Sequence, residues 1–424
     1  MSSLVIEGGI SLTGTITAGG NKNAVLPMIA ASLLSDEEVI LENVPGIRDV
    51  NGMLAVIQHL GGEVEREGSE VRIRAKEIHT HSVPRELCNA IRTSFLVAGP
   101  LLHRRGAAQL YPPGGDVIGR RRLDAHFYGL TKLGAEAAPE RFAFSSPRRL
   151  RGRDLFFDEA SVTATEHILM TAVLAEGTTV IRNAASEPHV CCLAEMLISM
   201  GAQIDGLHTN TLTVQGVDRL HGTRFRVVSD HIEIGSFLAL AAATGGSITV
   251  KDTVKSHFWM IRRVFEKFGI VLDFENDQVH LPPGQEPRIQ KDIGGIIPQI
   301  DDGPWPQFPS DLMSAMLVLA TQTEGTALFF EKMFESRMYF VDRLIQMGAS
   351  AIVCDPHRVV ISGKSRLRAQ TMSSPDIRAG IALLIAACCA TGTSVIDKAE
   401  IIDRGYENIT DKLDALGARV HREP

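Results

Sequence analysis

The sequence lacks long hydrophobic runs, low-complexity tracts and extended blocks of like charge. Its longest apolar stretch, GIALLIAACCATG, covers about a dozen residues, which suits a buried helix and is too short to cross a bilayer. The start, MSSLVIEGG, has neither a charged leader nor an apolar core, so we expect no secretory signal. These absences exclude a disordered chain and favour a globular protein of two or three domains with no membrane partner.

Cysteine and positive charge are also in short supply. The six cysteines include no C-x-x-C pair, which excludes zinc fingers and a disulfide framework. We therefore expect reduced cysteines that pack as small core residues, a cytoplasmic protein and no metal site. The net charge of −7 argues against a nucleic-acid partner, and the few basic clusters favour a small anionic ligand instead.

What the sequence does contain is a sixfold internal repeat of roughly 70 residues. One recurring motif, as in DEEVILENV and GTTVIRNA, is typical of a turn followed by a strand rich in β-branched residues. A second motif, such as HLGGEVE or SMGAQID, is typical of a helix that ends at glycine. We expect the glycine of the second motif to adopt the left-handed conformation in all six repeats, at Gly61, Gly134, Gly201, Gly269, Gly348 and Gly417.

Each repeat also has a helix that is apolar nearly all round, such as DHIEIGSFLALAAATGG, and a second helix with a one-sided apolar stripe. In the second helix of the third repeat, the stripe is formed by Val190, Leu193, Leu197 and Met200. Each repeat is thus predicted as a βαβαββ unit in an α/β (α+β) protein. Six units make two bodies of three, with the buried helices at their centres. The long segment 287–311 of the fifth repeat is the place where we expect an inserted functional loop.

The first turns of the buried helices carry charged residues. An acid there, such as Asp311 or Asp376, can simply cap the helix, but a cation is unfavourable at the positive end of the helix dipole. Lys22, Arg92 and Arg378 are therefore more readily explained as groups that hold an anion. We expect a ligand with more than one anionic group, bound between the two bodies.

The segment PPGGDVIGRRRLDAH, residues 112–126, places Asp116 in a turn rich in proline and glycine, directly before Arg120, Arg121 and Arg122. A solvated surface turn is the alternative interpretation. Nucleotide motifs do not account for it: GGNKNA is not a Walker loop, and GGDVIG is not a dinucleotide fingerprint.

These segments carry a resemblance. GGNKNAVLPMIAASLLSDEEVILENVPGIRDV, PPGGDVIGRRRLDAH, FPSDL, FESRMYFVDRLIQMGA, SPDIRAG and IIDRGYENITDKLDALGA resemble the UDP-N-acetylglucosamine enolpyruvyl transferase family in the same order and at matching spacing. The resemblance implies two inside-out α/β domains, each a threefold repeat. Residues 21–229 would form the first domain and carry a mobile loop at 112–122. Residues 1–20 and 230–424 would form the second, with the active site in the cleft between them.

The implied reaction moves the enolpyruvyl group of phosphoenolpyruvate to the 3-hydroxyl of UDP-N-acetylglucosamine by addition and elimination, with no cofactor. By similarity, the catalytic residues are Lys22, Asp116, Asp311 and Arg404. The substrate-binding residues are Asn23, Arg92, Arg121, Asp124, Ser161, Val162, Thr163, Met333, Arg337, Asp376 and Arg378.

The resemblance also implies roles for these residues. Asp311 would deprotonate the sugar hydroxyl, and Arg337 and Arg378 would hold the carboxylate of phosphoenolpyruvate. The phosphate would be held by Lys22, Arg121 and Arg404. The diphosphate of the nucleotide would face Arg92, and Asn23 and Asp376 would position the sugar and the intermediate. The nucleotide would also contact Asp124 and the segment 161–163.

The family usually has a cysteine, the residue alkylated by fosfomycin, where this chain has Asp116. We predict that Asp116 is protonated only in the closed, loaded state, that it protonates phosphoenolpyruvate or assists product release, and that the enzyme resists fosfomycin. Other departures from the family pattern are Arg122, Thr163, His231 and Leu96. We interpret His231 as a structural or cleft-lining residue rather than a general base.

Two alternatives stay open at this point. A 3-phosphoshikimate enolpyruvyl transferase shares the architecture, although the segment GGDVIGRRRLD favours a nucleotide sugar. A non-catalytic paralogue that binds UDP-sugars and regulates a partner is the other, although the retained carboxylate-binding arginines speak against it.

Overall fold

The computed structural model describes residues 2–116 and 118–424, and the chain forms two compact units. Unit 1 comprises Met1–Gly19, Asp116–Arg121 and Ser229–Pro424, and unit 2 comprises Gly20–Gly115 and Arg122–Val228. Each unit has its own cluster of buried hydrophobic residues. The segment Asp116–Arg121 groups with unit 1, whereas the sequence predicted the whole loop 112–122 as part of the first domain.

Among its described residues, unit 1 contains three four-stranded sheets. The first has the order β15-β16-β14-β2, with β2 at Thr13–Thr17, β14 at Ser247–Lys251, β15 at Asp273–Glu275 and β16 at Gln278–Leu281. The second has the order β17-β18-β20-β19, with β17 at Gln299–Asp301, β18 at Gly325–Phe330, β19 at Ala351–Asp355 and β20 at Arg358–Gly363. The third has the order β21-β22-β1-β23, with β1 at Ser3–Glu7, β21 at Thr371–Ser373, β22 at Thr393–Asp397 and β23 at Arg419–Glu423.

Unit 2 repeats this plan in its described part, with one smaller sheet. The order β13-β3-β5-β4 uses β3 at Glu38–Glu42, β4 at Glu63–Glu67, β5 at Glu70–Arg74 and β13 at Thr223–Arg226. The order β6-β8-β7 uses β6 at Ala107–Gln109, β7 at Glu136–Ala138 and β8 at Ala143–Ser145. The order β11-β12-β10-β9 uses β9 at Asp154–Phe156, β10 at Thr178–Arg182, β11 at Gln203–Asp205 and β12 at Thr211–Gln215.

In each unit, a strand from one end of the unit's sequence joins a sheet formed by the repeat at the other end. The strand β1 pairs antiparallel with β22 and β23, so the start of the chain completes the sheet of the last repeat. In unit 2, β13 pairs parallel with β3, so the end of this unit's third repeat completes the sheet of its first. This exchange makes each group of three repeats a closed body.

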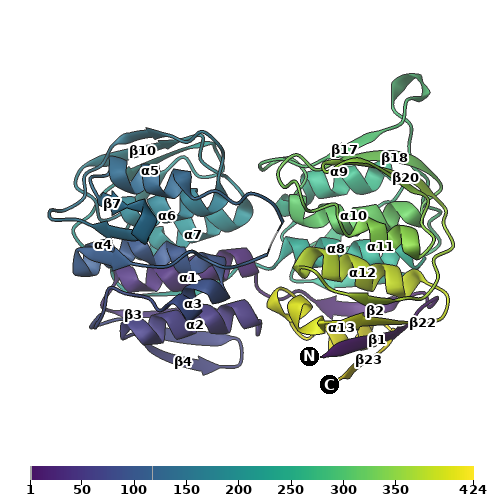
Figure 1. Cartoon of the computed structure of the whole chain (residues 1–424), viewed down its shortest axis with the longest axis horizontal. Helices are drawn as coiled ribbons and strands as arrows, with labels where there is room; N and C mark the ends of the chain where they lie inside the picture. The colour runs from purple at the N-terminus through teal and green to yellow at the C-terminus, as the bar shows by residue number, and fades with distance from the viewer. Residues whose placement is uncertain (1, 117) are drawn as a thin grey trace. The chain divides into compact units, whose positions relative to one another are not determined.

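The apolar helices lie at the centre of each unit. In unit 1, α8 (His231–Ala243), α10 (Ser310–Thr321) and α12 (Ile377–Cys389) lie side by side (Figure 1). In unit 2 the corresponding helices are α1 (Lys22–Ala31), α4 (Ala98–Arg105) and α6 (Val162–Ala172). Glycine allows close packing: a Cβ at Gly235 of α8 would lie 2.7 Å from Leu312 of α10. The predicted α/β fold with central buried helices is confirmed.

A second set of helices covers the sheets. It consists of α2 (Arg48–Leu60), α5 (Asp124–Lys132), α7 (Pro188–Ser199), α9 (Trp259–Lys267), α11 (Val341–Gln346) and α13 (Ile409–Ala415). The predicted glycines all follow or cap these helices with positive φ, from 70° at Gly269 to 109° at Gly61. Helix α7 departs from the one-sided stripe: Cys191, Cys192 and Met196 are buried as well, because α7 also packs against α1 and α6.

The second repeat departs most from the prediction. Its single expected helix is divided into α3 (Arg85–Ala90), the 3₁₀ helix η2 (Arg92–Val97) and α4. The break occurs at Ile91, whose extended backbone (φ −144°, ψ 147°) is incompatible with a continuous helix. The remaining 3₁₀ helices are η1 (Ser32–Leu34), η3 (Pro139–Arg141), η4 (Lys255–Phe258), η5 (Ile293–Gly295) and η6 (Ala399–Arg404).

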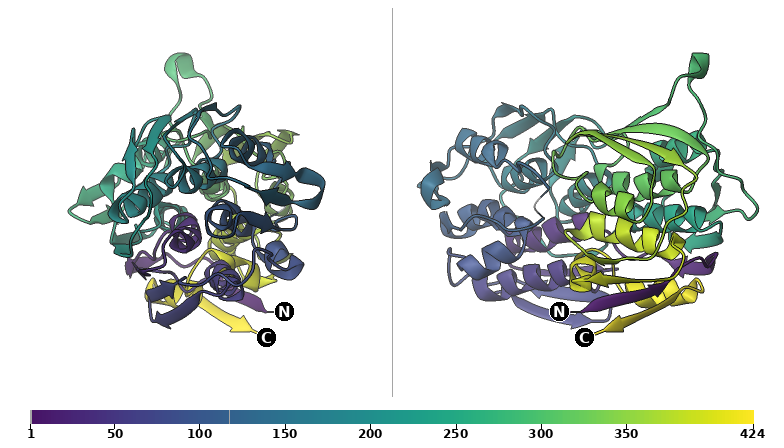
Figure 2. Two further views of the ribbon diagram at one scale, coloured as in Figure 1. Left: turned by 90° about the vertical axis from the view of Figure 1, so that its left-hand side faces the viewer. Right: turned by 45° about the vertical axis from the view of Figure 1, so that its right-hand side comes forward.

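A loop ahead of β17 projects from unit 1 (Figure 2). It exposes Ile293, Ile296 and Ile297, of which Ile293 is 97% exposed. The rest of the predicted inserted segment passes through β17 and leads into α10. A function for this segment stays a prediction.

Candidate active site

In unit 1, the carboxylate of Asp311 joins two arginines. Its Oδ1 accepts a hydrogen bond from Nη2 of Arg337 at 3.0 Å, and its Oδ2 accepts one from Nη2 of Arg378 at 2.7 Å. Asp311 lies in the first turn of α10, Arg378 lies in the first turn of α12, and both arginines are buried. Two buried guanidinium groups in one place form a centre that attracts anions.

The surroundings of Arg378 hold its side chain in one orientation. Its Nη1 donates to the hydroxyl of Tyr406 at 3.0 Å, and that hydroxyl also contacts the Ser236 hydroxyl at 2.9 Å. Burial alone would lower the pKa of Arg378, but Asp311, Tyr406 and Asp230 together raise it, so the group stays charged. Tyr406 was not predicted from the sequence, because a single tyrosine in a repeated segment does not indicate a contact with a distant arginine.

Asp376 caps α12 and lies near the same centre. Its Oδ1 accepts hydrogen bonds from the backbone N–H groups of Arg378 at 2.8 Å and Ala379 at 2.9 Å. Burial raises the pKa of Asp376, and these hydrogen bonds and Arg337 lower it in part. The capping explanation considered from the sequence is therefore correct for Asp376, and it does not exclude a role in binding.

Arg337 has hydrogen-bonding capacity left over. Its Nε and Nη1 are buried and have no hydrogen-bond acceptor among the described residues, although Nε lies 3.6 Å from Oε2 of Glu331. Burial, and then the neighbouring Asp302 carboxylate, which can accept a hydrogen bond from protonated Glu331, raise the pKa of Glu331. Buried donors without acceptors are costly, so this guanidinium suits an anionic ligand.

Described residues of the loop segment Asp116–Arg121 contact the rest of unit 1 at two places. Oδ1 of Asp116 accepts a hydrogen bond from Nη1 of Arg404 at 2.6 Å. Farther along, Oε2 of Glu335 accepts from the backbone N–H of Arg120 at 3.1 Å, and the carbonyl of Ile118 accepts from the N–H of Ser336 at 3.1 Å. The lone carboxylate of the glycine-rich loop is thus half of a charged pair rather than a solvated group.

Arg121 belongs to the same group of charges. Burial lowers its pKa, while the charges of Asp116 and Asp311 raise it, and those of Arg337 and Arg404 lower it further. The structure therefore brings together seven of the predicted site residues in unit 1, namely Asp116, Arg121, Asp311, Arg337, Asp376, Arg378 and Arg404. Met333 is partly exposed in the segment that follows β18, and its backbone N–H donates to Glu331.

In unit 2, Lys22 forms a buried ion pair. Its Nζ lies 2.8 Å from Oδ2 of Asp49, which is in the first turn of α2. The side chain of Asn21 caps α1 by accepting from the backbone N–H groups of Asn23 and Ala24. Asp49 explains how a cation is tolerated at a helix N-terminus, and sequence reasoning missed it because the acid lies in a different helix.

A second group in unit 2 contains Arg92 and the start of α5. Nη2 of Arg92 donates to the carbonyl of Arg122 at 3.1 Å, and Nε of Arg122 donates to Oδ2 of Asp124 at 3.0 Å. The segment Ser161, Val162 and Thr163 forms the start of α6, where the Ser161 hydroxyl accepts from the N–H of Ala164. Ser161, Val162 and Thr163 are all partly exposed.

His231 is buried at the start of α8 beside the rings of His257 and Trp305. Burial, and then the neighbouring His257, lower its pKa to about 3. With so low a pKa, the imidazole of His231 stays neutral throughout the physiological pH range and is a weak base. This environment agrees with a structural role.

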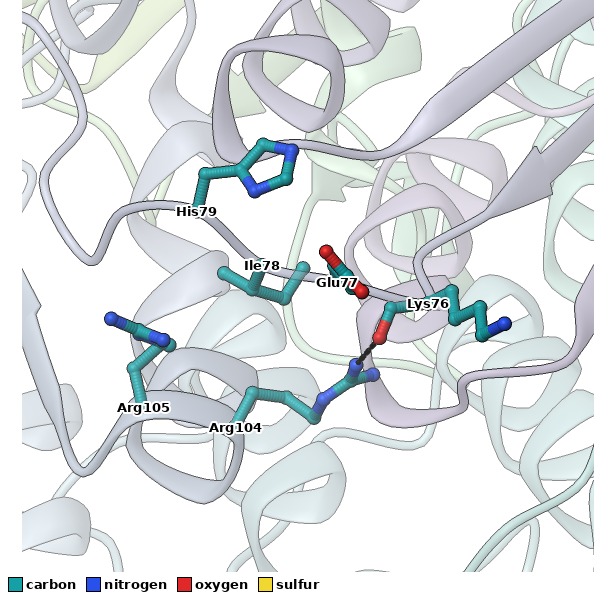
Figure 3. A pocket seen from close by; sticks show the side chains of 6 residues that line it. All are labelled: Lys76, Glu77, Ile78, His79, Arg104 and Arg105. Atoms are coloured by element: carbon teal, nitrogen blue, oxygen red, sulfur yellow. Dashed lines mark hydrogen bonds between the residues drawn. The ribbon is translucent and has the colours of Figure 1, made fainter.

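A polar pocket in unit 2 is lined by Lys76, Glu77, Ile78, His79, Arg104 and Arg105 and has a volume of about 450 Å³ (Figure 3). Its basic character does not make it an anion site. The guanidinium of Arg104 donates to four backbone carbonyls, those of Leu33, Ser35, Ala75 and Lys76. The pocket also lies at the C-terminal end of α4, where the helix dipole repels anions.

The described residues, 2–116 and 118–424, contain neither a metal-binding cluster nor a membrane-spanning helix. Within these residues, no set of three or more histidine, cysteine, aspartate or glutamate side chains is arranged to hold a metal ion. Likewise, none of their helices is both long enough and apolar enough to span a membrane. All six cysteines are free, and Cys354 is exposed, against the expectation that all would be core residues.

The fold and the clustered arginines define an enolpyruvyl transferase architecture. The solved structure of the enolpyruvyl transferase NikO from Streptomyces tendae matches with a TM-score of 0.87 at 19% identity, covering 100% of this chain and 99% of that one. An EPSP synthase from Acinetobacter baumannii matches with a TM-score of 0.78 at 17% identity, covering all of both chains.

Sequence comparison gives the family. The family model of EPSP synthase (3-phosphoshikimate 1-carboxyvinyltransferase) matches residues 6–413. The UDP-N-acetylglucosamine 1-carboxyvinyltransferases of Borreliella burgdorferi and Bradyrhizobium diazoefficiens are each 51% identical, covering 100% and 99% of this chain and 99% and 98% of theirs. That of Treponema pallidum is 49% identical over the whole of both chains. The chain belongs to this enzyme family, in the branch of the UDP-N-acetylglucosamine 1-carboxyvinyltransferases.

Proposed function

We propose that this enzyme transfers the enolpyruvyl group of phosphoenolpyruvate to the 3-hydroxyl of UDP-N-acetylglucosamine and releases phosphate. The observation that carries the proposal is the identity of about half of all residues, over the full length, to relatives named for this activity. The cluster of Asp311, Arg337 and Arg378 supports it, because the donor substrate carries a carboxylate and a phosphate that need cations.

The addition step forms a bond between the sugar oxygen and the second carbon of phosphoenolpyruvate. We assign Asp311 as the base that takes the hydroxyl proton, and its two arginine partners keep its carboxylate charged. The methylene carbon takes up a proton to become a methyl group. In the elimination step, a methyl proton and the phosphate leave, and the double bond forms again.

The arginines divide the two anionic groups of the donor between them. Arg337 and Arg378 would hold the carboxylate, since guanidinium groups bind carboxylates through parallel hydrogen bonds. Arg121 and Arg404 would hold the phosphate together with Lys22. The buried donors of Arg337 without acceptors agree with this assignment, because an arriving carboxylate would satisfy them.

Asp116 is the proposed acid that protonates the methylene carbon or assists the release of product. In the structure it is paired with Arg404, the residue proposed to bind phosphate. A phosphate bound by Arg404 and Arg121 would draw these two cations away from Asp116 and add a nearby negative charge. Both changes favour the protonated carboxyl, which is the form that an acid needs.

The nucleotide sugar would be bound mainly by residues of unit 2. Arg92 would face the diphosphate, and Asp124 and residues 161–163 would contact the nucleotide. Asn23 would position the sugar and Asp376 the intermediate, with Met333 also in contact with substrate. These roles are the ones that the family resemblance implies, and Thr163 departs from the family pattern within this set.

The product of this reaction is an enolpyruvyl nucleotide sugar, and we place the enzyme at the first committed step of peptidoglycan synthesis. The free cysteines agree with the reducing cytoplasm as its compartment. Asp116 stands where the family usually has the cysteine that fosfomycin alkylates. A carboxylate attacks an epoxide far more slowly than a thiolate, so fosfomycin resistance is part of the proposal.

The competing acceptor is 3-phosphoshikimate, because the matching family model carries that name. The test is the release of phosphate from phosphoenolpyruvate with each acceptor in turn. Turnover with UDP-N-acetylglucosamine alone is expected. Turnover with 3-phosphoshikimate alone would replace the proposal, and binding of both substrates without phosphate release would favour a non-catalytic paralogue.

A further inference from the structure

Two buried histidines of unit 2 connect the backbone of α4 to the hydroxyl of Thr163. Nε2 of His167 accepts a hydrogen bond from the backbone N–H of Gly99 at 3.0 Å. Nδ1 of His167 lies 3.0 Å from Nδ1 of His126, and Nε2 of His126 lies 3.1 Å from Oγ1 of Thr163. These three contacts form one continuous chain of hydrogen bonds.

The backbone N–H of Gly99 determines where the protons lie along this chain of hydrogen bonds. An amide N–H can only donate, so Nε2 of His167 carries no proton, and the neutral ring has its proton on Nδ1. That proton is donated to Nδ1 of His126, so His126 has its own proton on Nε2. Nε2 of His126 therefore donates to Oγ1 of Thr163, and the Thr163 hydroxyl proton must point to another acceptor.

Both histidines are held neutral, which preserves this order. Burial lowers the pKa of His167 to about 3. Burial, then His167, then Arg92 lower the pKa of His126 well below its usual value. Phe95 packs edge-on against both rings, with centroid distances of 5.3 Å to His126 and 5.8 Å to His167.

Thr163, at the end of this chain of hydrogen bonds, is accessible to a ligand. Thr163 is partly exposed in the first turn of α6, whereas His126 and His167 are buried. Arg92, which carries a positive charge, is close enough to affect the titration of His126. The start of a helix and an arginine both favour an anion or another electron-rich oxygen near this hydroxyl.

We propose that His126 and His167 are positioning residues that orient the Thr163 hydroxyl as a donor to an acceptor oxygen of the nucleotide part of the sugar substrate. The inference rests on the proposed function, which supplies the nucleotide. Either a phosphate oxygen or a carbonyl oxygen of the base has the required chemistry. With Nε2 of His126 donating to Oγ1, the Thr163 hydroxyl can direct its own proton toward the ligand.

Kinetics provide the first test. Thr163→Val, which removes only the hydroxyl, is expected to raise KM for UDP-N-acetylglucosamine about tenfold, while KM for phosphoenolpyruvate and kcat change less than about twofold. Thr163→Ser is the matched control and is expected to retain the wild-type value. An unchanged KM in Thr163→Val would overturn the proposal.

A double-mutant cycle between His167 and Thr163 tests the role of the histidines. His167→Leu breaks the chain, whereas His167→Asn places an amide N–H where Nδ1 donates and should retain much of the affinity. His167→Leu is expected to cost the same as Thr163→Val, and the double variant is expected to cost no more than either. Additive losses would show that the histidines do not act through Thr163.

A direct readout does not depend on activity or on these variants folding. In the unliganded wild-type protein, ¹⁵N NMR of labelled histidine should show His167 with its proton on Nδ1 and His126 with its proton on Nε2. The opposite tautomer at His126 would overturn the inference even if the enzyme turns over as proposed. Failure of wild-type turnover with intact tautomers would instead count against the proposed function.

Comparison of UDP with CDP tests whether one particular base carbonyl is the acceptor, because CDP has an amino group in its place. If the hydroxyl faces that carbonyl, Thr163→Val should lose part of the wild-type preference for UDP. If it faces a phosphate or the base carbonyl that UDP and CDP share, the variant should bind both nucleotides more weakly and by the same factor. Unchanged binding of both would contradict the proposal.

Discussion

Asp116 and Arg404 form a hydrogen-bonded ion pair of 2.6 Å between Oδ1 and Nη1. The pair ties the glycine-rich loop to the 3₁₀ helix η6 of unit 1, across 288 positions in the sequence. Both side chains are largely buried, with 17% of Asp116 and 21% of Arg404 exposed. An arginine proposed to bind phosphate is thus occupied by the carboxylate that is proposed to act as the acid.

The identity of residue 116 is expected to decide the response to fosfomycin. Wild-type protein should keep its activity and its unmodified mass after incubation with the drug, because a carboxylate is a weak nucleophile toward an epoxide. Asp116→Cys should be inactivated with time and gain the mass of one fosfomycin molecule, since the neighbouring Arg404 favours the thiolate. Intact mass spectrometry distinguishes the two outcomes, and a rapid adduct on Asp116 itself would contradict the assignment.

Asp311→Asn tests the proposed base. The amide is close in size to the carboxylate and can still accept from one arginine, but it cannot take a proton, so kcat should fall by about 100-fold or more. KM for the two substrates should change much less. The exposed Asp342→Asn on α11 is the matched control and should behave as wild type. Retention of kcat in Asp311→Asn would exclude this residue as the base.

Arg378→Lys tests the carboxylate site. A lysine cannot hold Asp311 and Tyr406 simultaneously in the fork geometry of a guanidinium, so kcat/KM for phosphoenolpyruvate should fall by about 100-fold. Tyr406→Phe removes one of the two contacts and should have a smaller effect, about tenfold. The comparison is made by steady-state kinetics with UDP-N-acetylglucosamine saturating. Equal losses in both variants would show that orientation by Tyr406, rather than the fork itself, dominates.

The ion pair between Lys22 and Asp49 is expected to contribute to stability as well as to the site. Asp49→Asn leaves the buried ammonium of Lys22 without its counterion and should lower the free energy of unfolding by about 3 kcal/mol, measured by urea denaturation. Replacing both partners, with Lys22→Met and Asp49→Leu, should recover most of that loss while activity stays low. Asp218→Asn, which removes the carboxylate of an ion pair in which the Asp218 side chain is 93% exposed, should have no measurable effect.

His231 should make folding sensitive to acid. Its pKa is about 3 in the folded protein, whereas an unfolded histidine titrates near 6.5. Between these values the unfolded state binds more protons, so stability falls as the pH drops through this window, by about 2 kcal/mol at pH 5. His231→Leu should lose this contribution, which would appear as a smaller difference in urea midpoint between pH 7 and pH 5. The exposed His421→Gln is the control, and an unchanged slope in His231→Leu would contradict the prediction.

The fold was largely predictable because its signals are local and repeated. A left-handed glycine after a helix, as at Gly61 or Gly348, reflects backbone sterics that a short segment imposes by itself. Helices such as α8 that are apolar on all sides can only be stable in a core. The division at Ile91 was not predictable, since the flanking residues form good helices and the break is visible only in the backbone.

The types of residue in the candidate site were also readable, because cations at helix N-termini require an explanation in any structure. Lys22 and Arg378 were found in this way, and the family resemblance added Arg337 and Arg404. Their partners were not found. Asp49, Tyr406 and the pair of His126 and His167 have no local signature, because each acts through a contact with a residue far away in the sequence.

The sequence by itself thus determined the repeat, the secondary structure of most repeats, the apolar faces and the list of charged residues, since all of these depend on neighbours within about one helical turn or one strand. Only the tertiary structure decided that Asp116 pairs with Arg404, that Asp311 joins two arginines, and that two histidines order the protons up to Thr163. Hydrogen bonds and ion pairs act over about 3 Å, and residues hundreds of positions apart come within that range only after the chain has folded.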